Sequence, residues 1–216
     1  MLSQIYEITL MNLRNIPSRL GSSSVIVVGI AGVVGVLLGL LSMAVGFNNS
    51  LQSAGQADRA IIMRAGTTSE MNGAMSAEQR AIIRAMEGVE AASGEIYVVA
   101  AIEKKDTDIT ANVVVRGVEQ ASFVVRPEIE IVAGRNFVPG RAEIIVGVKA
   151  AGEFSGLAVG EELPVRDQSW QVVGHFVSGG SAYESEIWAD LANVQSAYRR
   201  GGFASTMRVK WSLRQR

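Results

Sequence analysis

The sequence predicts a membrane-anchored α+β protein in which one N-terminal transmembrane helix is followed by a mixed α/β domain. Two observations carry this prediction. No charged residue occurs from Leu20 to Ala57, and beyond that gap β-rich segments alternate with short helical ones. The expected organisation has three parts: a cytoplasmic amphipathic helix at 1–21, a transmembrane helix and its extension at 22–57, and an extracytoplasmic domain at 58–216.

The charge balance and the cysteine count exclude several classes of function. The chain has 216 residues with 20 Lys+Arg against 21 Asp+Glu, a formal net charge of -1 and no cysteine. A near-neutral chain lacks the basic excess that binds a phosphate backbone, so no nucleic-acid partner is expected. Without cysteine there is no disulfide framework, no thiolate metal site and no cysteine nucleophile.

The first segment has the spacing of an amphipathic helix. Its apolar residues recur mostly three and four positions apart, and Pro17 is the expected break before the next helix. Such a helix is expected to lie in the cytoplasmic interface with membrane lipid against its apolar face. The alternative is a short frayed cytoplasmic tail. The apolar residues are Leu2, Ile5, Tyr6, Leu10, Leu13 and Leu20.

The next segment is long enough to cross a membrane. Val25–Phe47 is a 23-residue apolar run interrupted only by Ser42. As a helix it measures roughly 34 Å, against a hydrocarbon core of about 30 Å. It has no polar face, which argues against a buried helix of a soluble protein. It also exceeds the roughly 7–15 residues of a secretory apolar region, so an uncleaved signal anchor is favoured over a cleaved signal peptide.

The flanking charges predict which way the anchor faces. Arg14, Arg19 and the chain's amino group precede the apolar run, Glu7 is the only acid before it, and the ten residues after it are uncharged. The positive-inside bias therefore places the N-terminus in the cytoplasm and residues 58–216 outside a bacterial inner membrane.

Small residues inside the anchor predict a helix-packing face. Ala31, Gly35 and Gly39 lie four positions apart, and the last two form a G-x-x-x-G pair. Small residues let two membrane helices approach closely enough for backbone packing, so a membrane partner is expected here. The alternative is the background frequency of glycine in membrane helices.

The outer segment shows a succession of short elements. Ser76-Ala77-Glu78-Gln79 is a capping-box start for a helix whose apolar face is Ile82, Ile83 and Met86 and which ends at Gly88. A hairpin is expected around the charged turn 104–106. Strands are expected at 60–64, 95–103, 109–118, 128–132, 143–146, 162–165, 170–177 and 206–211, with short helices at 149–154 and 190–198, the latter capped by Asp190.

A search for chemistry yields no catalytic, cofactor-binding or metal-binding residue. His175, the single histidine, has no local nucleophile or acid partner and is interpreted as an ordinary strand histidine. Glu184 and Glu186 are expected to share one face of a strand, either as a site for a hard cation or cationic ligand or, as we favour, as solvated acids. The glycines from Gly29 to Gly35 lack the Gly-Lys-Ser/Thr ending of a phosphate loop. We therefore expect no enzyme and no cofactor.

Several short segments, taken in order, resemble the MacB/FtsX-type ABC transporter permeases of the mechanotransmission class. An amphipathic start and one glycine-rich span precede a large outer domain that contains a turn like the family's G-R-x-F and strands like those that follow it. The segments are Leu10–Asn15, Gly134-Arg135-Asn136-Phe137, Glu143–Gly147 with Ala150, Ala151 and Phe154, Val159-Gly160-Glu161, Trp170–Gly174, and Ser185–Ala189 in the place of a strand before a helix.

The resemblance implies a permease subunit, or the N-terminal portion of one, with no chemistry of its own. It implies a separate cytoplasmic ABC ATPase, whose motion the first span transmits to the outer domain for export or extraction of a substrate. It also implies a homodimer or pairing with a further membrane subunit. Such permeases have three further spans after this domain, which this sequence does not contain, so a fragment, a truncated product or a split subunit is expected.

Two other functions remain open. The first is a single-pass membrane-anchored binding or scaffold protein with no transport coupling. The second is a membrane-anchored hydrolase, which would need a nucleophile and a base assembled by the fold around His175.

Overall fold

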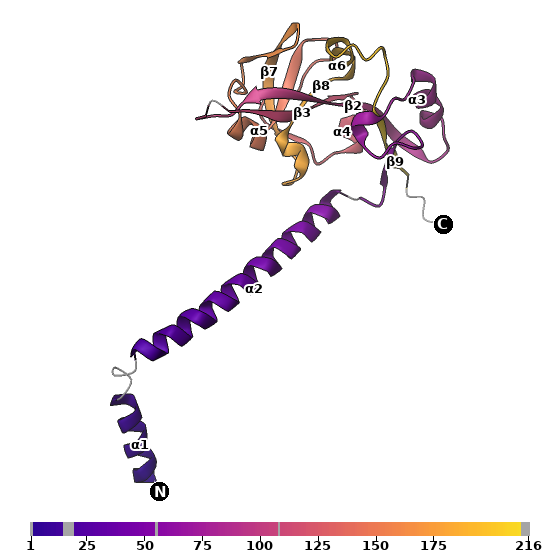
Figure 1. The fold of residues 1–216 in the computed structure, drawn as a ribbon. Helices are drawn as coiled ribbons and strands as arrows, with labels where there is room; N and C mark the ends of the chain where they lie inside the picture. The colour runs from indigo at the N-terminus through magenta and orange to yellow at the C-terminus, as the bar shows by residue number, and fades with distance from the viewer. Residues whose placement is uncertain (1, 15–19, 55, 108, 213–216) are drawn as a thin grey trace. The chain divides into compact units, whose positions relative to one another are not determined.

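The computed structural model describes residues 2–14, 20–54, 56–107 and 109–212 (Figure 1). The chain divides into two compact units, the first reaching to Gln52 and the second beginning at Ser53. Each unit is described by itself.

The first unit contains two helices. Helix α1 spans Leu2–Arg14 and α2 spans Leu20–Ala54. Within α2, Ser24–Asn48 is long and apolar enough to cross a membrane, and its side chains are exposed. The predicted apolar run at 25–47 lies inside this stretch. The expected break at Pro17 falls outside the described residues.

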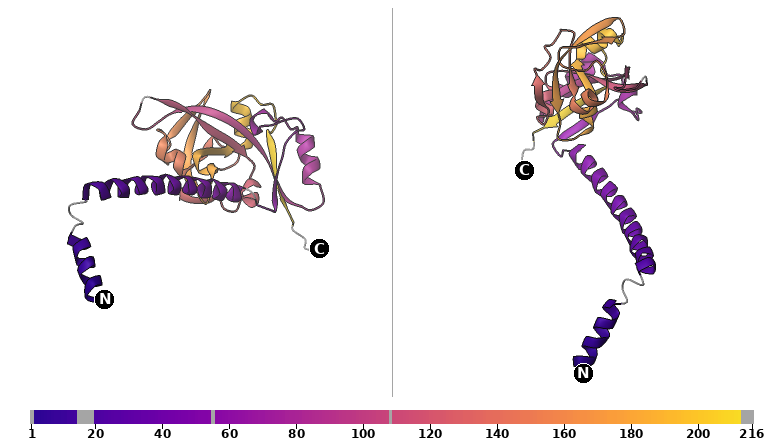
Figure 2. Two further views of the ribbon diagram at one scale, coloured as in Figure 1. Left: turned by 60° about the horizontal axis from the view of Figure 1, so that its bottom comes forward. Right: turned by 90° about the vertical axis from the view of Figure 1, so that its left-hand side faces the viewer.

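The second unit is an α+β domain built on one mixed sheet (Figures 1 and 2). Its strands are β1 Arg59–Ile62, β2 Val89–Glu103, β3 Thr110–Val118, β4 Glu130–Gly134, β5 Glu143–Gly147, β6 Glu162–Val165, β7 Gln168–Val177, β8 Glu186–Asp190 and β9 Thr206–Trp211. Its helices are α3 Ala77–Arg84, α4 Ser122–Val125, α5 Val148–Glu153 and α6 Leu191–Ala197, with the 3-10 turns η2 Glu70–Asn72 and η3 Ala182–Ser185.

The strand order is β1-β9-β2-β3-β8-β5-β7-β4, with β6 paired to β7. The pairs β3·β8 and β5·β7 are parallel, and the other pairs are antiparallel. The predicted hairpin is confirmed, because β2 and β3 pair antiparallel from Glu95↔Val118 to Glu103↔Thr110. Strand β2 begins earlier than predicted, at Val89, because its first residues pair with β9.

The two faces of the central sheet are covered differently. On one face, Ile96, Val115 and Ile187 belong to the largest apolar core, which includes Leu191 and Val194 of helix α6. Side chains alternate along a strand, so Glu95, Arg116 and Glu186, one position away from those residues, point to the opposite face. The second face is covered by α4, η2 and η3, and its aromatic core contains Trp188 and Phe176.

Helix α3 confirms one prediction and corrects another. The capping box is present, since Ser76 and Gln79 each accept a hydrogen bond from the other's backbone N–H. The predicted apolar face is right for Ile83, which packs against an apolar core cluster, and wrong for Ile82 and Met86, which are exposed, whereas Arg80 is buried. Arg80 turns inward because it donates to Glu119, 3.1 Å away, and to the carbonyl of Gly202. The helix also ends at Arg84, four residues before Gly88.

Candidate functional site: a buried ion network beside a basic pocket

The small residues predicted to form a packing face lie on one side of α2. Ala31 is exposed, and a Cβ atom added at Gly35 or Gly39 would meet no heavy atom within 4 Å among the described residues, apart from the helix's own backbone. The surface of this face is therefore free for close approach. Its role in helix packing stays a prediction.

The predicted acidic pair Glu184 and Glu186 does not share a strand face. Glu184 lies in η3, whereas Glu186 begins β8, and both are buried, at 5% and 6% exposure. The expectation of solvated acids is wrong because each carboxylate has its own buried donors. Glu184 accepts from the backbone N–H groups of Ser178 and Gly180, and Lys149 lies 3.1 Å away. Glu186 accepts from Nε and Nη2 of Arg116.

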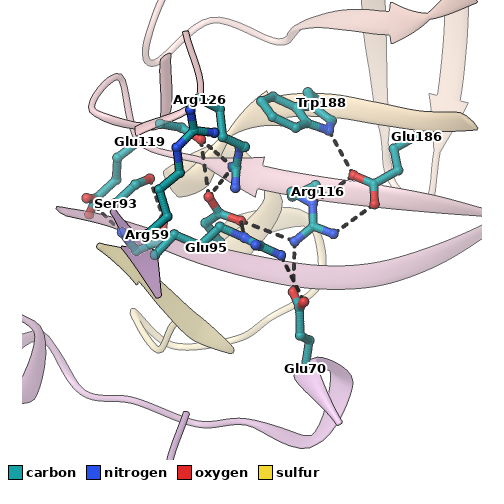
Figure 3. Close-up of polar contacts among 12 residues, drawn as sticks. Arg59, Glu70, Ser93, Glu95, Arg116, Glu119, Arg126, Glu186 and Trp188 are labelled. Carbon is teal, nitrogen blue, oxygen red and sulfur yellow. Dashed lines mark hydrogen bonds and ion pairs between the residues drawn. The ribbon is translucent and has the colours of Figure 1, made fainter. Parts of the chain in front are cut away.

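The second face of the sheet holds a buried carboxylate surrounded by arginines (Figure 3). Glu95 of β2 is fully buried and accepts hydrogen bonds from Arg116 Nη1 at 3.1 Å, Arg208 Nε at 3.2 Å and Ser122 Oγ at 3.1 Å. Arg126 Nη2 also donates to it. One carboxylate thus joins β2, β3, β9 and α4.

Arg116 extends the network toward β8 and η2. Its Nε and Nη2 donate to the two carboxylate oxygens of Glu186 at 2.7 and 2.8 Å, and its Nη1 reaches Glu70 at 2.9 Å. Glu70 also accepts from Arg208 at 2.9 Å, and the Trp188 indole donates to Glu186 at 2.9 Å. Three carboxylates therefore neutralise three guanidinium groups, which is the arrangement that makes buried charge tolerable. We call Glu70, Glu95, Arg116, Arg126, Glu186 and Arg208 the ion network.

Aromatic rings cover the network where it meets η3. The guanidinium carbons of Arg116, Arg126 and Arg208 lie 5.4, 5.0 and 5.5 Å from the centroid of the Tyr183 ring. Arg126 also lies 4.7 Å from the Trp188 ring. Contacts of this kind attract the cation to the ring face and keep water away from it.

The charges of the network decide the protonation of Glu95. Burial by itself raises the pKa of the Glu95 carboxyl, but the three arginines outweigh that effect and lower the pKa to about 2, from an ordinary 4.5. Burial lowers the pKa of Arg116, whereas the charge of Glu186 and its hydrogen bonds raise it well above the ordinary value. Glu95 and Arg116 are therefore both ionised throughout the physiological pH range.

Sequence reasoning missed the network, although a weak signal was present. Arg116 interrupts a valine-rich run at 113–118, and Glu95 starts the run that pairs with it. Alternation of this kind is also what an exposed strand face produces. Only the covering elements α4, η2 and η3 turn these positions into buried ones.

The turn quoted as G-R-x-F has a structural role. Gly134 has φ of +70°, and a Cβ there would lie 2.2 Å from the Val173 carbonyl oxygen, so the position requires glycine. Arg135 donates to both oxygens of Glu143 at 2.7 Å. This bond lowers the pKa of Glu143 to about 2 against the opposing effect of desolvation.

The His175 side chain makes a single hydrogen bond to the backbone among the described residues. His175 lies on β7, half-buried, with Nε2 2.7 Å from the Leu157 carbonyl oxygen, a position that suits a structural hydrogen bond. Among the residues that the structure describes, no three or more His, Asp or Glu side chains are grouped to hold a metal ion.

A basic pocket lies beside the network, where the chain enters the sheet. Arg59 of β1 donates to both oxygens of Glu128 at 2.6 and 2.8 Å. A cavity of about 50 Å³ lies beside this pair, and a wider cleft of about 410 Å³ adjoins it through shared lining residues. We call the smaller one the arginine pocket; its lining residues are Arg59, Ala60, Ile61, Val125, Arg126, Glu128, Tyr183 and Arg208.

A strongly apolar helix joined to a mixed-sheet α+β domain is the architecture of a membrane-anchored protein. The chain belongs to the family of the MacB-like periplasmic core domain, whose profile matches residues 23–212. This domain is a part of ABC-type transporter permeases, which are transport components and not an enzyme class. The predicted family and fold are thereby confirmed.

Two solved structures share the fold. The periplasmic region of MacB from Actinobacillus actinomycetemcomitans superposes with a TM-score of 0.57 at 10% identity, covering 74% of this chain and 77% of that one. The extracellular domain of the noncanonic ABC-type transporter YknZ from Gram-positive bacteria gives 0.53 at 14% identity, covering 72% and 83%. Among curated proteins no match is found.

The ion network predicts how the stability of the outer domain depends on Glu95. Replacing Glu95 by Gln leaves the buried Arg116 and Arg126 and the half-buried Arg208 without their shared counter-charge, which is expected to cost roughly 3–5 kcal/mol of unfolding free energy at pH 7. The matched control Glu90→Gln removes a surface pair with Lys210, worth less than about 1 kcal/mol. Urea unfolding of the full chain in detergent, followed by tryptophan fluorescence, measures both.

The same pair of proteins tests the pH dependence. Because folding lowers the pKa of Glu95 to about 2, its contribution is complete above its ordinary pKa of 4.5 and is lost as the pH falls from there toward 2. The native chain should therefore lose more stability between pH 5 and pH 3 than Glu95→Gln does. Equal losses, or a Glu95→Gln variant as stable as Glu90→Gln, would show that this charge does not hold the domain together.

Proposed function

We propose that the chain is a permease subunit, or the N-terminal portion of one, of an ABC-type transport system. In this proposal a separate cytoplasmic ATPase drives motion of the membrane helix, and the outer domain uses that motion to export or extract a substrate. Family membership supports the proposal, and the structural neighbour YknZ is described as a noncanonic ABC-type transporter.

The path of the chain from α2 into the sheet is the observation that carries the proposal. Helix α2 ends at Ala54 and β1 begins at Arg59, so few residues separate the apolar helix from the first strand. Strand β1 pairs with β9, and Arg208 of β9 donates to both Glu95 and Glu70. The ion network in turn binds β9 to β2, β3 and β8. A displacement of β1 therefore acts directly on β9 and, through the network, on those strands.

The orientation forms part of the proposal. Arg14 and Arg19 precede the apolar helix, so the N-terminus is proposed to lie in the cytoplasm and residues 58–216 outside the inner membrane. Helix α1 exposes Ile5, Tyr6 and Leu10 together with polar residues, as suits a helix lying on lipid at the cytoplasmic interface.

The absence of cysteine makes the orientation directly testable. Single cysteines are introduced at Gln4 in α1 and at Thr107 in the exposed turn between β2 and β3. In intact spheroplasts a membrane-impermeant maleimide should label Thr107→Cys and should leave Gln4→Cys unlabelled until the membrane is disrupted. The reverse pattern would place the outer domain in the cytoplasm and end the permease proposal.

Coupling to an ATPase is tested by affinity purification from native membranes with a tag on the N-terminus. A P-loop ATPase is expected to copurify and to be identified by mass spectrometry, with or without a separate multi-span subunit. Recovery of the chain alone, or only with outer-compartment proteins, would contradict ATP coupling. It would favour the second candidate, an anchored binding or scaffold protein, for which the arginine pocket and its adjoining cleft are the supporting observation.

The small-residue face of α2 is proposed as the contact with a second copy or a further membrane subunit. Gly35 and Gly39 leave space for close helix approach, and Ala31 continues the same face. Energy transfer between two differently labelled copies in bilayers would report self-association.

Bulky residues should abolish this contact. The Gly35→Ile, Gly39→Ile double variant is expected to lose most of the energy transfer or, where the partner is a different subunit, its copurification. Gly29→Ile is the matched control, because Gly29 lies about 120° around the helix from Gly35. Equal behaviour of the double variant and the control would remove this face from the proposal.

A further inference from the structure

The arginine pocket contains hydrogen-bond donors that have no acceptor. Arg126 is 2% exposed, and only its Nη2 is engaged, with Glu95 and Ser122. Its Nε and Nη1, like the Nε of Arg59, are buried without a hydrogen-bond partner among the described residues. Buried donors of a charged group carry a large cost when they are left unpaired, so each one calls for an explanation.

The carboxylates around these donors do not satisfy them: Asp58 Oδ1 lies 3.7 Å from Arg59 Nε, beyond hydrogen-bond distance. Both oxygens of Glu128 accept from Arg59 Nη1, and both oxygens of Glu95 accept from arginines of the ion network. Three arginines and one glutamate line the pocket. The group missing from the pocket is therefore an acceptor, and because the free donors belong to guanidinium groups, charge-assisted hydrogen bonding favours a carboxylate.

The shape of the pocket narrows the choice of acceptor. A cavity of about 50 Å³ suits a small planar group, and a carboxylate fits the free donors because its two oxygens can accept charge-assisted hydrogen bonds from two different arginines. The guanidinium carbon of Arg126 lies 5.0 Å from the centroid of the Tyr183 ring and 4.7 Å from that of the Trp188 ring, and these contacts hold Arg126 in place with its Nε and Nη1 as the donors left to bind a ligand.

The adjoining cleft has room for the rest of the molecule to which the carboxylate belongs. It shares Arg59, Glu128 and Tyr183 with the arginine pocket and encloses about 410 Å³. Ser178 and Ser181 line it, and the Oγ atoms of both are buried without a hydrogen-bond partner among the described residues. Hydroxyls of this kind donate to or accept from the amides of a peptide.

We infer that the arginine pocket binds a carboxylate group of a peptide or protein, with Arg126 and Arg59 as the charged donors and the cleft at Ser178 and Ser181 holding the adjacent residues. The carboxylate comes either from a C-terminus or from an acidic side chain. The inference does not depend on ATP coupling, so its failure and that of the proposed function are distinguishable.

The test is a titration of the full chain in detergent micelles with ¹⁵N-labelled tryptophan. The indole signal of Trp188 is the reporter, since its ring lies 4.7 Å from the Arg126 guanidinium carbon. Three probes are compared at constant ionic strength: N-acetylated trialanine with a free C-terminus, the same peptide amidated, and amidated acetyl-Ala-Asp-Ala. Saturable shifts at roughly millimolar concentration are expected for a carboxylate peptide, as suits so small a ligand, and none for amidated trialanine.

The two carboxylate peptides distinguish the sources. Tighter binding of free trialanine identifies a C-terminal carboxylate, and tighter binding of the aspartate peptide identifies an acidic side chain; either result supports the site. Inorganic phosphate is titrated in parallel, and phosphate binding in place of both peptides would overturn the assignment to a carboxylate. Equal shifts with amidated trialanine, or no saturation with any peptide, would show that the pocket binds no carboxylate. Either result would also overturn the inference.

Variants connect the signal to the pocket. Arg126→Gln disturbs the ion network and risks unfolding, so Arg59→Gln is the principal variant. Loss of one charge-assisted donor should weaken binding about tenfold. Ser178→Ala should weaken binding of the peptides but not of acetate. Arg84→Gln is the matched control, because Arg84 pairs with Glu119 outside the pocket, and it should bind like the native chain. Unchanged affinity in Arg59→Gln would place the binding elsewhere.

Discussion

The constraint on which the outer domain depends is the burial of the Glu95 carboxylate. A lone carboxylate removed from water at this depth would cost far more than the few kcal/mol by which a domain is stable. Glu95 is tolerated because four donors reach it from three other elements, Arg116 on β3, Arg208 on β9, and Ser122 and Arg126 at α4. These elements therefore have to be in place together, or the charge is left unpaired.

This requirement explains features of the sheet that strand propensity alone does not. Glu186 accepts from Nε and Nη2 of Arg116, and β8 lies alongside β3 in a parallel register with Val114 opposite Glu186. Glu70 bridges Arg116 and Arg208, which holds the short turn η2 against the same face. Replacing a buried ion network by apolar residues is often neutral for stability. We therefore infer that the network determines how the strands and turns are arranged more than it raises the stability of the domain.

The sequence predicted the fold class and most strands, because alternation and turn residues are local signals. The hairpin at 95–118, the capping box at Ser76 and the last strand at 206–211 all depend on residues close together in the chain. The candidate site was not predicted, because its members come from residues as far apart as Glu70 and Arg208. Glu184 and Glu186 illustrate the limit: alternation gave them one exposed face, whereas η3 and Arg116 bury each of them separately.

The position of the arginine pocket links the two proposals physically. Its walls include Arg59 and Ile61 of β1, the strand that follows the apolar helix, and Arg126 and Arg208 of the ion network. A carboxylate held by Arg59 and Arg126 would add a second charged contact between the entering strand and the end of α4, beside the pair that Arg59 makes with Glu128. Under the permease proposal, a displacement of β1 relative to α4 would separate these two donors and weaken that contact. Carboxylate binding and displacement of β1 are then coupled through Arg59 and Arg126. Displacement of β1 lowers the affinity for the carboxylate, and a bound carboxylate raises the free energy needed to displace β1 by the same amount.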